Sequence, residues 1–255
     1  VKALHKEGYP VAVLAPSGNH SATGMRINLM KPMAYRSRED LVKRWGLDPH
    51  TTPVHLFELD GTPCDTMIVA LDGGINHLVP GVHPQMVVSG VNLGPNLSQD
   101  SYHSGTMGAA REAGLYGVPA IASSFTSFDP DGMERAVDAT LEAVAKAATV
   151  LPVKAANLGR PRGALDAGYF TSWPAPATDD RWHEDPERAL LEAFSNGDMM
   201  LNINAPSSWD GAWATTRLGV RWYRNAVRFG DEGVDATATF TIGAASVDHS
   251  VVAAG

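Results

Sequence analysis

A short apolar run, a polar loop and the start of a helix follow one another directly between residues 86 and 116. The apolar run Met86–Ser89 predicts a buried strand that stops at Gly90. Ser104-Gly105-Thr106 then opens a pattern rich in Ala and Gly, which predicts a helix over Thr106–Tyr116. A strand that reaches a helix through a polar loop is the unit from which α/β proteins are built. The first N–H groups and the positive dipole end of such a helix favour an anion such as phosphate.

The same alternation of strand and helix patterns runs to about residue 150, weakens in a proline-rich stretch, and returns before residue 206. Strands are expected at Val11–Ala15, Val54–Leu59, Val118–Ala122 and Met199–Ile203. Helices are expected at Val1–Glu7, at Cys64–Leu71, from Asp129-Pro130 to about Thr149, and at Glu187–Phe194. Strands that alternate with helices predict an α/β fold with a Rossmann-like, doubly wound, mostly parallel sheet.

After Pro206 the pattern changes to β-hairpins. Strand character is expected at Ala214–Leu218, Arg221–Phe229 and Ala236–Ile242, with a turn at Gly230–Gly233. We therefore expect an α/β core over 1–206, and over 207–255 a β-hairpin extension that belongs to the same domain or forms an oligomer contact.

The composition limits the classes of function. The formal net charge is −8, and the 20 Lys and Arg residues are scattered, which disfavours a nucleic-acid partner. No run of about 18 apolar residues predicts a membrane span, so a cytoplasmic protein is the default expectation. The single Cys64 is expected to be a small buried hydrophobe. A small anionic substrate fits if N–H dipoles or a cation supply positive charge locally.

Five segments together carry a resemblance that covers nearly the whole chain. They are Ser89-Gly-Val-Asn-Leu-Gly-Pro-Asn96, Ser104-Gly-Thr106, Ala15-Pro16 leading through Asn19-His20 to Ser21, Gly61-Thr-Pro-Cys-Asp65, and Leu201-Asn-Ile-Asn-Ala-Pro206. Their order and spacing resemble the survival protein E (SurE) family of metal-dependent nucleoside monophosphate phosphatases.

The resemblance implies one divalent cation, Mg²⁺ or Mn²⁺, with Ser21 and Asn92 among its ligands. It also implies two aspartates in an Asn-Asp-Asp-Gly motif at the end of a strand that precedes Val11. No Asp occurs before Asp40. We therefore expect a chain that begins after this strand and ends before a last strand of the family. A version without a functional metal site is the alternative.

The resemblance also places Asn96, Ser104, Gly105 and Thr106 around the phosphate. Gly105 is expected to let backbone N–H groups approach the anion without a Cβ in the way. The implied reaction is hydrolysis of nucleoside 5′- or 3′-monophosphates to nucleoside and phosphate by a metal-activated water, in a homodimer or homotetramer. The residues assign no general acid or base.

Two alternatives to this phosphatase stay open. One is a nucleotide- or phosphate-binding protein without activity, and the other is a Rossmann-like transferase that uses a nucleotide donor. Asp65 is expected to cap its own helix. Tyr102, Trp222 and Tyr223 are candidate surfaces for stacking a nucleobase.

Overall fold

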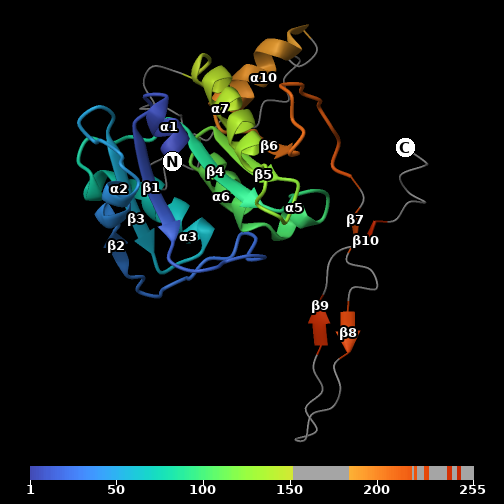
Figure 1. Cartoon of the computed structure of the whole chain (residues 1–255), viewed down its shortest axis with the longest axis horizontal. Coiled ribbons are helices and arrows are strands. Elements are labelled where there is room, and N and C mark those ends of the chain that lie inside the picture. The colour runs from blue at the N-terminus through green and yellow to red at the C-terminus, as the bar shows by residue number, and fades with distance from the viewer. Residues whose placement is uncertain (152–183, 220, 223–226, 230–239, 243–245, 248–255) are drawn as a thin grey trace, which may run out of the picture.

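The computed structural model describes residues 1–151 and 184–219, and four short strands at 221–222, 227–229, 240–242 and 246–247 (Figure 1). The strands of the α/β body are β1 (Val11–Pro16), β2 (Tyr35–Ser37), β3 (Val54–Leu59), β4 (Val87–Leu93), β5 (Ala120–Phe125) and β6 (Met200–Ala205). Its helices are α1 (Lys2–Lys6), α2 (Glu39–Arg44), α3 (Pro63–Val69), the wider turn η1 (Ala70–Gly74), α4 (Ile75–Leu78), α5 (Asp100–His103), α6 (Gly105–Leu115), α7 (Glu134–Ala148) and α10 (Pro186–Ser195).

Within these described residues, the strands of the body form two three-stranded sheets rather than the single sheet that the sequence predicts. One sheet has the order β1-β3-β2, with β1 and β3 parallel and β2 antiparallel to β3. The other sheet has the order β4-β5-β6 and is parallel throughout. The α/β class and the parallel strands are confirmed, but the first sheet is mixed.

The strands β1 and β4 are less buried than their apolar sequences predict. In β1 only Leu14 is buried, and every residue of β4 is half-buried or exposed. In the described residues each of these strands pairs with a strand on one side only, so it is an edge strand of its sheet. The central strand β5, which pairs on both sides, is buried over its whole length.

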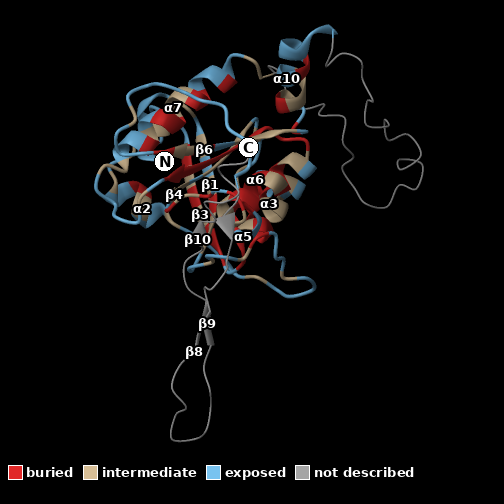
Figure 2. Cartoon of the chain, turned by 90° about the vertical axis from the view of Figure 1, so that its right-hand side faces the viewer, coloured by how far each residue is buried: buried red, intermediate tan, exposed pale blue. Residues whose placement is uncertain are grey.

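Helices cover both faces of the second sheet. Ala120 and Ala122 of β5 pack against α6, whereas Ile121 packs against α7. Successive side chains of a strand point to opposite faces, so this alternation places α6 and α7 on the two sides of the sheet. Figure 2 shows α6 as largely buried and α7 as buried along one side only.

Two boundaries differ from the predicted ones for local reasons. β4 continues through Gly90 to Leu93, because a bulge between Ser89 and Asn92 absorbs the glycine. α7 begins at Glu134 rather than at Asp129-Pro130, because Gly132 has a φ of +86°, which a right-handed helix cannot contain.

The extension after Pro206 contains antiparallel strand pairs. β7 (Arg221–Trp222) pairs with β10 (Ser246–Val247), and β8 (Val227–Phe229) pairs with β9 (Phe240–Ile242). The β8–β9 pair follows the predicted β-hairpin, whereas no strand is predicted at β10, and Figure 1 shows both pairs away from the α/β body. The predicted strand at Ala214–Leu218 is wrong, because these residues are exposed and pair with no other described strand. The predicted turn at Gly230–Gly233 and most of the predicted strand at Ala236–Ile242 lie outside the described residues.

None of the helices in the described part of the chain is long and apolar enough to cross a membrane.

Candidate phosphate and metal site

The first turn of α6 follows the loop after β4 and the short helix α5, with Ser104 between the two helices. Ser104 is the N-cap of this 11-residue helix, and its hydroxyl accepts a hydrogen bond from Met107 N at 3.1 Å. The next backbone N–H groups, those of Gly105 and Thr106, have no hydrogen-bond acceptor in the described part of the chain, and neither does the half-buried Thr106 hydroxyl. Ser104 therefore caps the helix, while Gly105 and Thr106 leave donors free at its positive end. We call Ser104, Gly105 and Thr106 the α6 entrance.

The loop after β1, residues 17–24, packs directly on the α6 entrance. Gly24 N donates to His103 O at 2.7 Å. A Cβ added to Gly105 would lie 2.9 Å from Pro63 Cγ, 3.1 Å from Thr23 Oγ1 and 3.2 Å from His20 O. The missing side chain of Gly105 thus makes room for the β1 loop and α3. That it also lets an anion approach stays a prediction, and its backbone N–H has no acceptor among the described residues.

Ser21 lies in this β1 loop, which the packing holds against the α6 entrance. It is exposed, and its hydroxyl donates to Asn19 Oδ1 at 2.8 Å. The same Asn19 oxygen accepts a hydrogen bond from Ser21 N at 2.9 Å. The hydroxyl oxygen of Ser21 keeps lone pairs that a hard cation can bind.

Asn92 lies inside β4, whereas the sequence predicts a position just beyond the end of this strand. The bulge before it needs Gly90, because Gly90 has a φ of +123° and an added Cβ would lie 2.3 Å from Ser123 O. The side chain of Asn92 donates through Nδ2 to Gly94 O at 2.7 Å. Its Oδ1 has no donor among the described residues, and it is therefore free to bind a cation.

Asn96 connects the loop after β4 to the two neighbouring strands. Its side chain donates through Nδ2 to Ser124 Oγ of β5 at 2.7 Å, and its backbone N donates to Asn204 Oδ1 of β6 at 2.9 Å. Its backbone O accepts from Asn202 Nδ2 at 3.0 Å. Asn96 is 5% exposed. These contacts make Asn96 an anchor for the loop, and they explain the two asparagines in the Leu201–Pro206 segment.

Asp65 does not belong to the metal donors. Its carboxylate accepts from Thr62 N and from both the backbone and side-chain nitrogen atoms of Asn28, at 2.7–2.8 Å. Burial acts to raise the pKa of Asp65, but the hydrogen bonds from Asn28 and Thr62 outweigh it and lower the pKa. The predicted capping role is confirmed, since Thr62 and Asp65 form a capping box at the start of α3.

Cys64 is a buried and unreactive thiol, as predicted. It is 0% exposed, and burial together with the negative charges of Glu112 and Asp65 raises its pKa to about 12. The thiolate that would bind a metal or attack a substrate is therefore absent near neutral pH.

The donors at the site fit a hard divalent cation in kind but do not complete its shell. Ser21 and Asn92 offer neutral oxygens, which Mg²⁺ and Mn²⁺ accept. Among the residues that the structure describes, no group of three or more His, Cys, Asp or Glu side chains could hold a metal ion.

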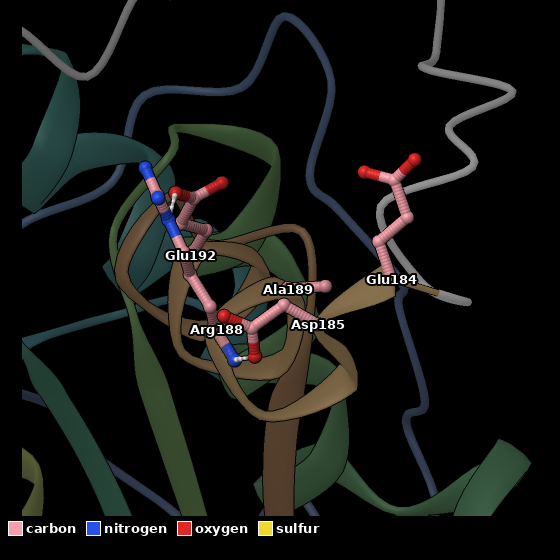
Figure 3. A pocket seen from close by; sticks show the side chains of 5 residues that line it. All are labelled: Glu184, Asp185, Arg188, Ala189 and Glu192. Atoms are coloured by element: carbon pink, nitrogen blue, oxygen red, sulfur yellow. Dashed lines mark hydrogen bonds and ion pairs between the residues drawn. The ribbon is translucent and has the colours of Figure 1, made fainter.

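A separate surface hollow lies along α10 (Figure 3) and is formed by α10 and the two residues before it. Three of its four charged residues, Asp185, Arg188 and Glu192, have structural partners. Asp185 caps the helix by accepting from Arg188 N at 3.1 Å, and Arg188 Nε donates to Glu192 Oε1 at 2.9 Å. None of the predicted site residues lines this hollow.

The fold and the site define a class: an α/β protein in which polar loops after parallel strands meet the open start of a helix, an arrangement suited to a small anionic ligand. The family model described as Survival protein SurE matches residues 1–225. The chain belongs to the SurE family.

Known proteins agree with this assignment. The chain is 32% identical over 221 residues to a protein of Anaeromyxobacter sp. named 5′-nucleotidase SurE, which covers 87% of this chain and 63% of the relative. It is 39% identical over 125 residues to the 5′-nucleotidase SurE of Desulfitobacterium hafniense, covering 49% of this chain and 43% of the relative. The chain thus spans less than two thirds of either relative. The crystal structure of the Sure protein from Aquifex aeolicus matches with a TM-score of 0.56 and 22% identity, over 91% of this chain and 70% of that one, and so supports the fold.

Proposed function

We propose that the chain is part of a nucleotidase, an enzyme that hydrolyses nucleoside 5′- or 3′-monophosphates to nucleoside and inorganic phosphate. The observation that carries the proposal is the α6 entrance, where the Gly105 and Thr106 N–H groups have no acceptor among the described residues. The family membership and the names of the relatives support the same reaction.

In this proposal the α6 entrance binds the phosphate. The two N–H groups and the Thr106 hydroxyl donate to phosphoryl oxygens, and the helix dipole favours their negative charge. Asn96 holds the loop in place through β5 and β6, and one N–H of its carboxamide remains for the same ligand.

Ser21 and Asn92 would hold one divalent cation, Mg²⁺ or Mn²⁺, through their neutral oxygens. When bound, the cation would supply positive charge and a water of lowered pKa. The protein around it orients these oxygens, because Asn19 holds the Ser21 hydroxyl and Gly94 O holds the Asn92 amide. We expect a homodimer or homotetramer, with the extension after Pro206 as the contact.

A second candidate is a nucleotide- or phosphate-binding protein without catalytic activity. It is favoured by the neutral donor set, since a cation without carboxylate ligands binds weakly. The two candidates differ in whether phosphate is released from a bound nucleotide.

The test measures phosphate release from a panel of nucleoside monophosphates with Mg²⁺, with Mn²⁺ and with a chelator, and measures binding of the same nucleotides by calorimetry. The nucleotidase predicts metal-dependent release that falls sharply in Asn92→Ala. The matched control is Asn196→Ala, an exposed residue whose side chain makes no hydrogen bond within the described chain. Binding without release in any metal, also by a chain extended upstream through the strand that the resemblance places before Val11, would replace the nucleotidase with the binding protein.

A further inference from the structure

Phe128 is an exposed aromatic residue beside the candidate site. It lies in the loop after β5, and its Cδ1–Cε1–Cζ side rests on Gly94 in the loop after β4. A Cβ added to Gly94 would lie 2.5 Å from Phe128 Cε1 and 3.0 Å from Cδ1. Phe128 is nevertheless 74% exposed, whereas Phe125 in the same segment is 0% exposed. Phe125 fills the core, and the ring of Phe128 stays open to a ligand.

The position of Gly94 brings this ring close to the site. Gly94 is two residues from Asn92 and two from Asn96, so its Cα lies within about 7 Å of theirs. Leu93 and Leu97, which flank Gly94 and Asn96 in the sequence, are each 43% exposed. The exposed ring of Phe128 therefore lies against the short segment that carries Asn92 and Asn96, which are predicted to hold metal and phosphate.

A ligand that fits both surfaces carries an anionic group at one end and a flat, apolar ring at the other. We propose that Phe128 stacks against the nucleobase of the substrate while the α6 entrance holds its phosphate. This inference rests on the proposed function and adds to it the part of the protein that distinguishes a nucleotide from other phosphate esters. Stacking uses the π-face that every base has, so the expected preference is for a base over no base, with little choice among bases.

Phe128 is a better candidate for stacking the nucleobase than the aromatic residues that the sequence singles out. The ring of Tyr102 already has a cation partner, because the Arg111 guanidinium lies 5.7 Å from its centroid. The side chains of Trp222 and Tyr223 lie outside the described residues.

The experiment compares adenosine 5′-monophosphate with ribose 5-phosphate, which has the same phosphate and sugar but no base. Phe128→Ala is expected to lower kcat/KM for the nucleotide by about 5- to 150-fold, the range measured when a stacking aromatic is removed. Hydrolysis of ribose 5-phosphate should not change, and Phe128→Trp should keep the preference for the nucleotide. The control is Leu115→Ala, which changes another exposed apolar residue, at the opposite end of α6.

An equal fall for both substrates, or no fall for the nucleotide, would overturn the stacking role while leaving the nucleotidase intact. If the wild-type protein, also when extended upstream through the strand that the resemblance places before Val11, releases phosphate from neither compound, the nucleotidase proposal fails, and calorimetry decides the stacking role by itself. Tighter binding of the nucleotide than of ribose 5-phosphate, lost in Phe128→Ala, would support it. Equal binding of the two compounds, or no binding of either, would overturn it.

Discussion

The substitution Gly105→Ala tests whether this glycine serves packing rather than access for an anion. The new Cβ would meet three atoms closer than ordinary van der Waals contact, at 2.9 Å, 3.1 Å and 3.2 Å. None of the three can move freely. Pro63 is the first residue of α3, Thr23 Oγ1 donates to His20 O at 2.8 Å, and His20 O is a backbone atom.

The expected cost follows from these contacts. Overpacking a close-packed site costs about 1–3 kcal/mol, and the better helix propensity of Ala returns at most about 0.5–1 kcal/mol. The net loss of stability is therefore up to about 2.5 kcal/mol, with a central value of about 1 kcal/mol. Gly108→Ala should cost more, because its Cβ would lie 2.2 Å from Gly24 O, a backbone atom. In Gly18→Ala, in the loop after β1, the added Cβ meets nothing within 4 Å, and stability should change by less than about 0.5 kcal/mol.

Urea denaturation measures this order, provided that the slope of the free energy against urea is the same in all variants. The midpoint should fall in the order Gly18→Ala, Gly105→Ala, Gly108→Ala. A Gly105→Ala protein as stable as the wild type, with weakened phosphate binding, would refute the packing argument and return the glycine to the anion site.

Two further predictions concern Thr106 and the ion pairs of β2 and β3. Thr106→Val removes a hydroxyl while keeping the shape, so the Kd for a nucleoside monophosphate should rise by about tenfold or more, as expected for a hydrogen bond to a charged group, with the urea midpoint nearly unchanged; an unchanged Kd would remove the hydroxyl from the site. Hydrogen bonds from Arg36 and Arg38 lower the pKa of Glu58 in the folded protein. A lowered pKa gives stability that is complete above the ordinary value of 4.5 and is lost as the pH falls through the folded-state value. Glu58→Gln should therefore flatten the fall of the unfolding free energy as the pH drops below 4.5, whereas Glu187→Gln, which removes an exposed carboxylate, should keep the wild-type slope. Equal slopes in both variants would contradict the linkage.

Local patterns predict the elements of this chain better than their pairing. The bounds predicted for the strand Val54–Leu59 are those of β3, and the helix predicted at Thr106–Tyr116 differs from α6 by one residue at each end. These patterns depend on residues close in sequence, such as the glycines and prolines that end an element. The separation into two sheets depends on which strands pair. An apolar run such as Val11–Ala15 has the same sequence pattern in an edge strand as in a central strand of a sheet.

The predicted site illustrates the same limit. The motif placed Asn96 near a phosphate, but its contacts with Asn202 and Asn204 join residues 106 and 108 positions apart, for which no local signal exists. Likewise, Gly90 ends a predicted strand because glycine weakens strands. In the structure a bulge absorbs the glycine, and β4 goes on to carry Asn92.

These structural roles reduce the site to a few atoms. In the segment Ser89–Thr106, Gly90 shapes the bulge, Asn96 anchors the loop, Ser104 caps α6 and Gly105 admits the β1 loop. The atoms left for a ligand are Asn92 Oδ1, two backbone N–H groups, the Thr106 hydroxyl and one carboxamide N–H. All except Asn92 Oδ1 are hydrogen-bond donors, so a phosphate can bind to them without a metal. Asn92 Oδ1 is an acceptor, and it can bind on the same side as the phosphate only if a cation lies between the two. A chelator should accordingly stop hydrolysis while leaving measurable phosphate binding. The affinity for phosphate without metal, divided by the affinity with metal, then measures how much of the binding the α6 entrance provides.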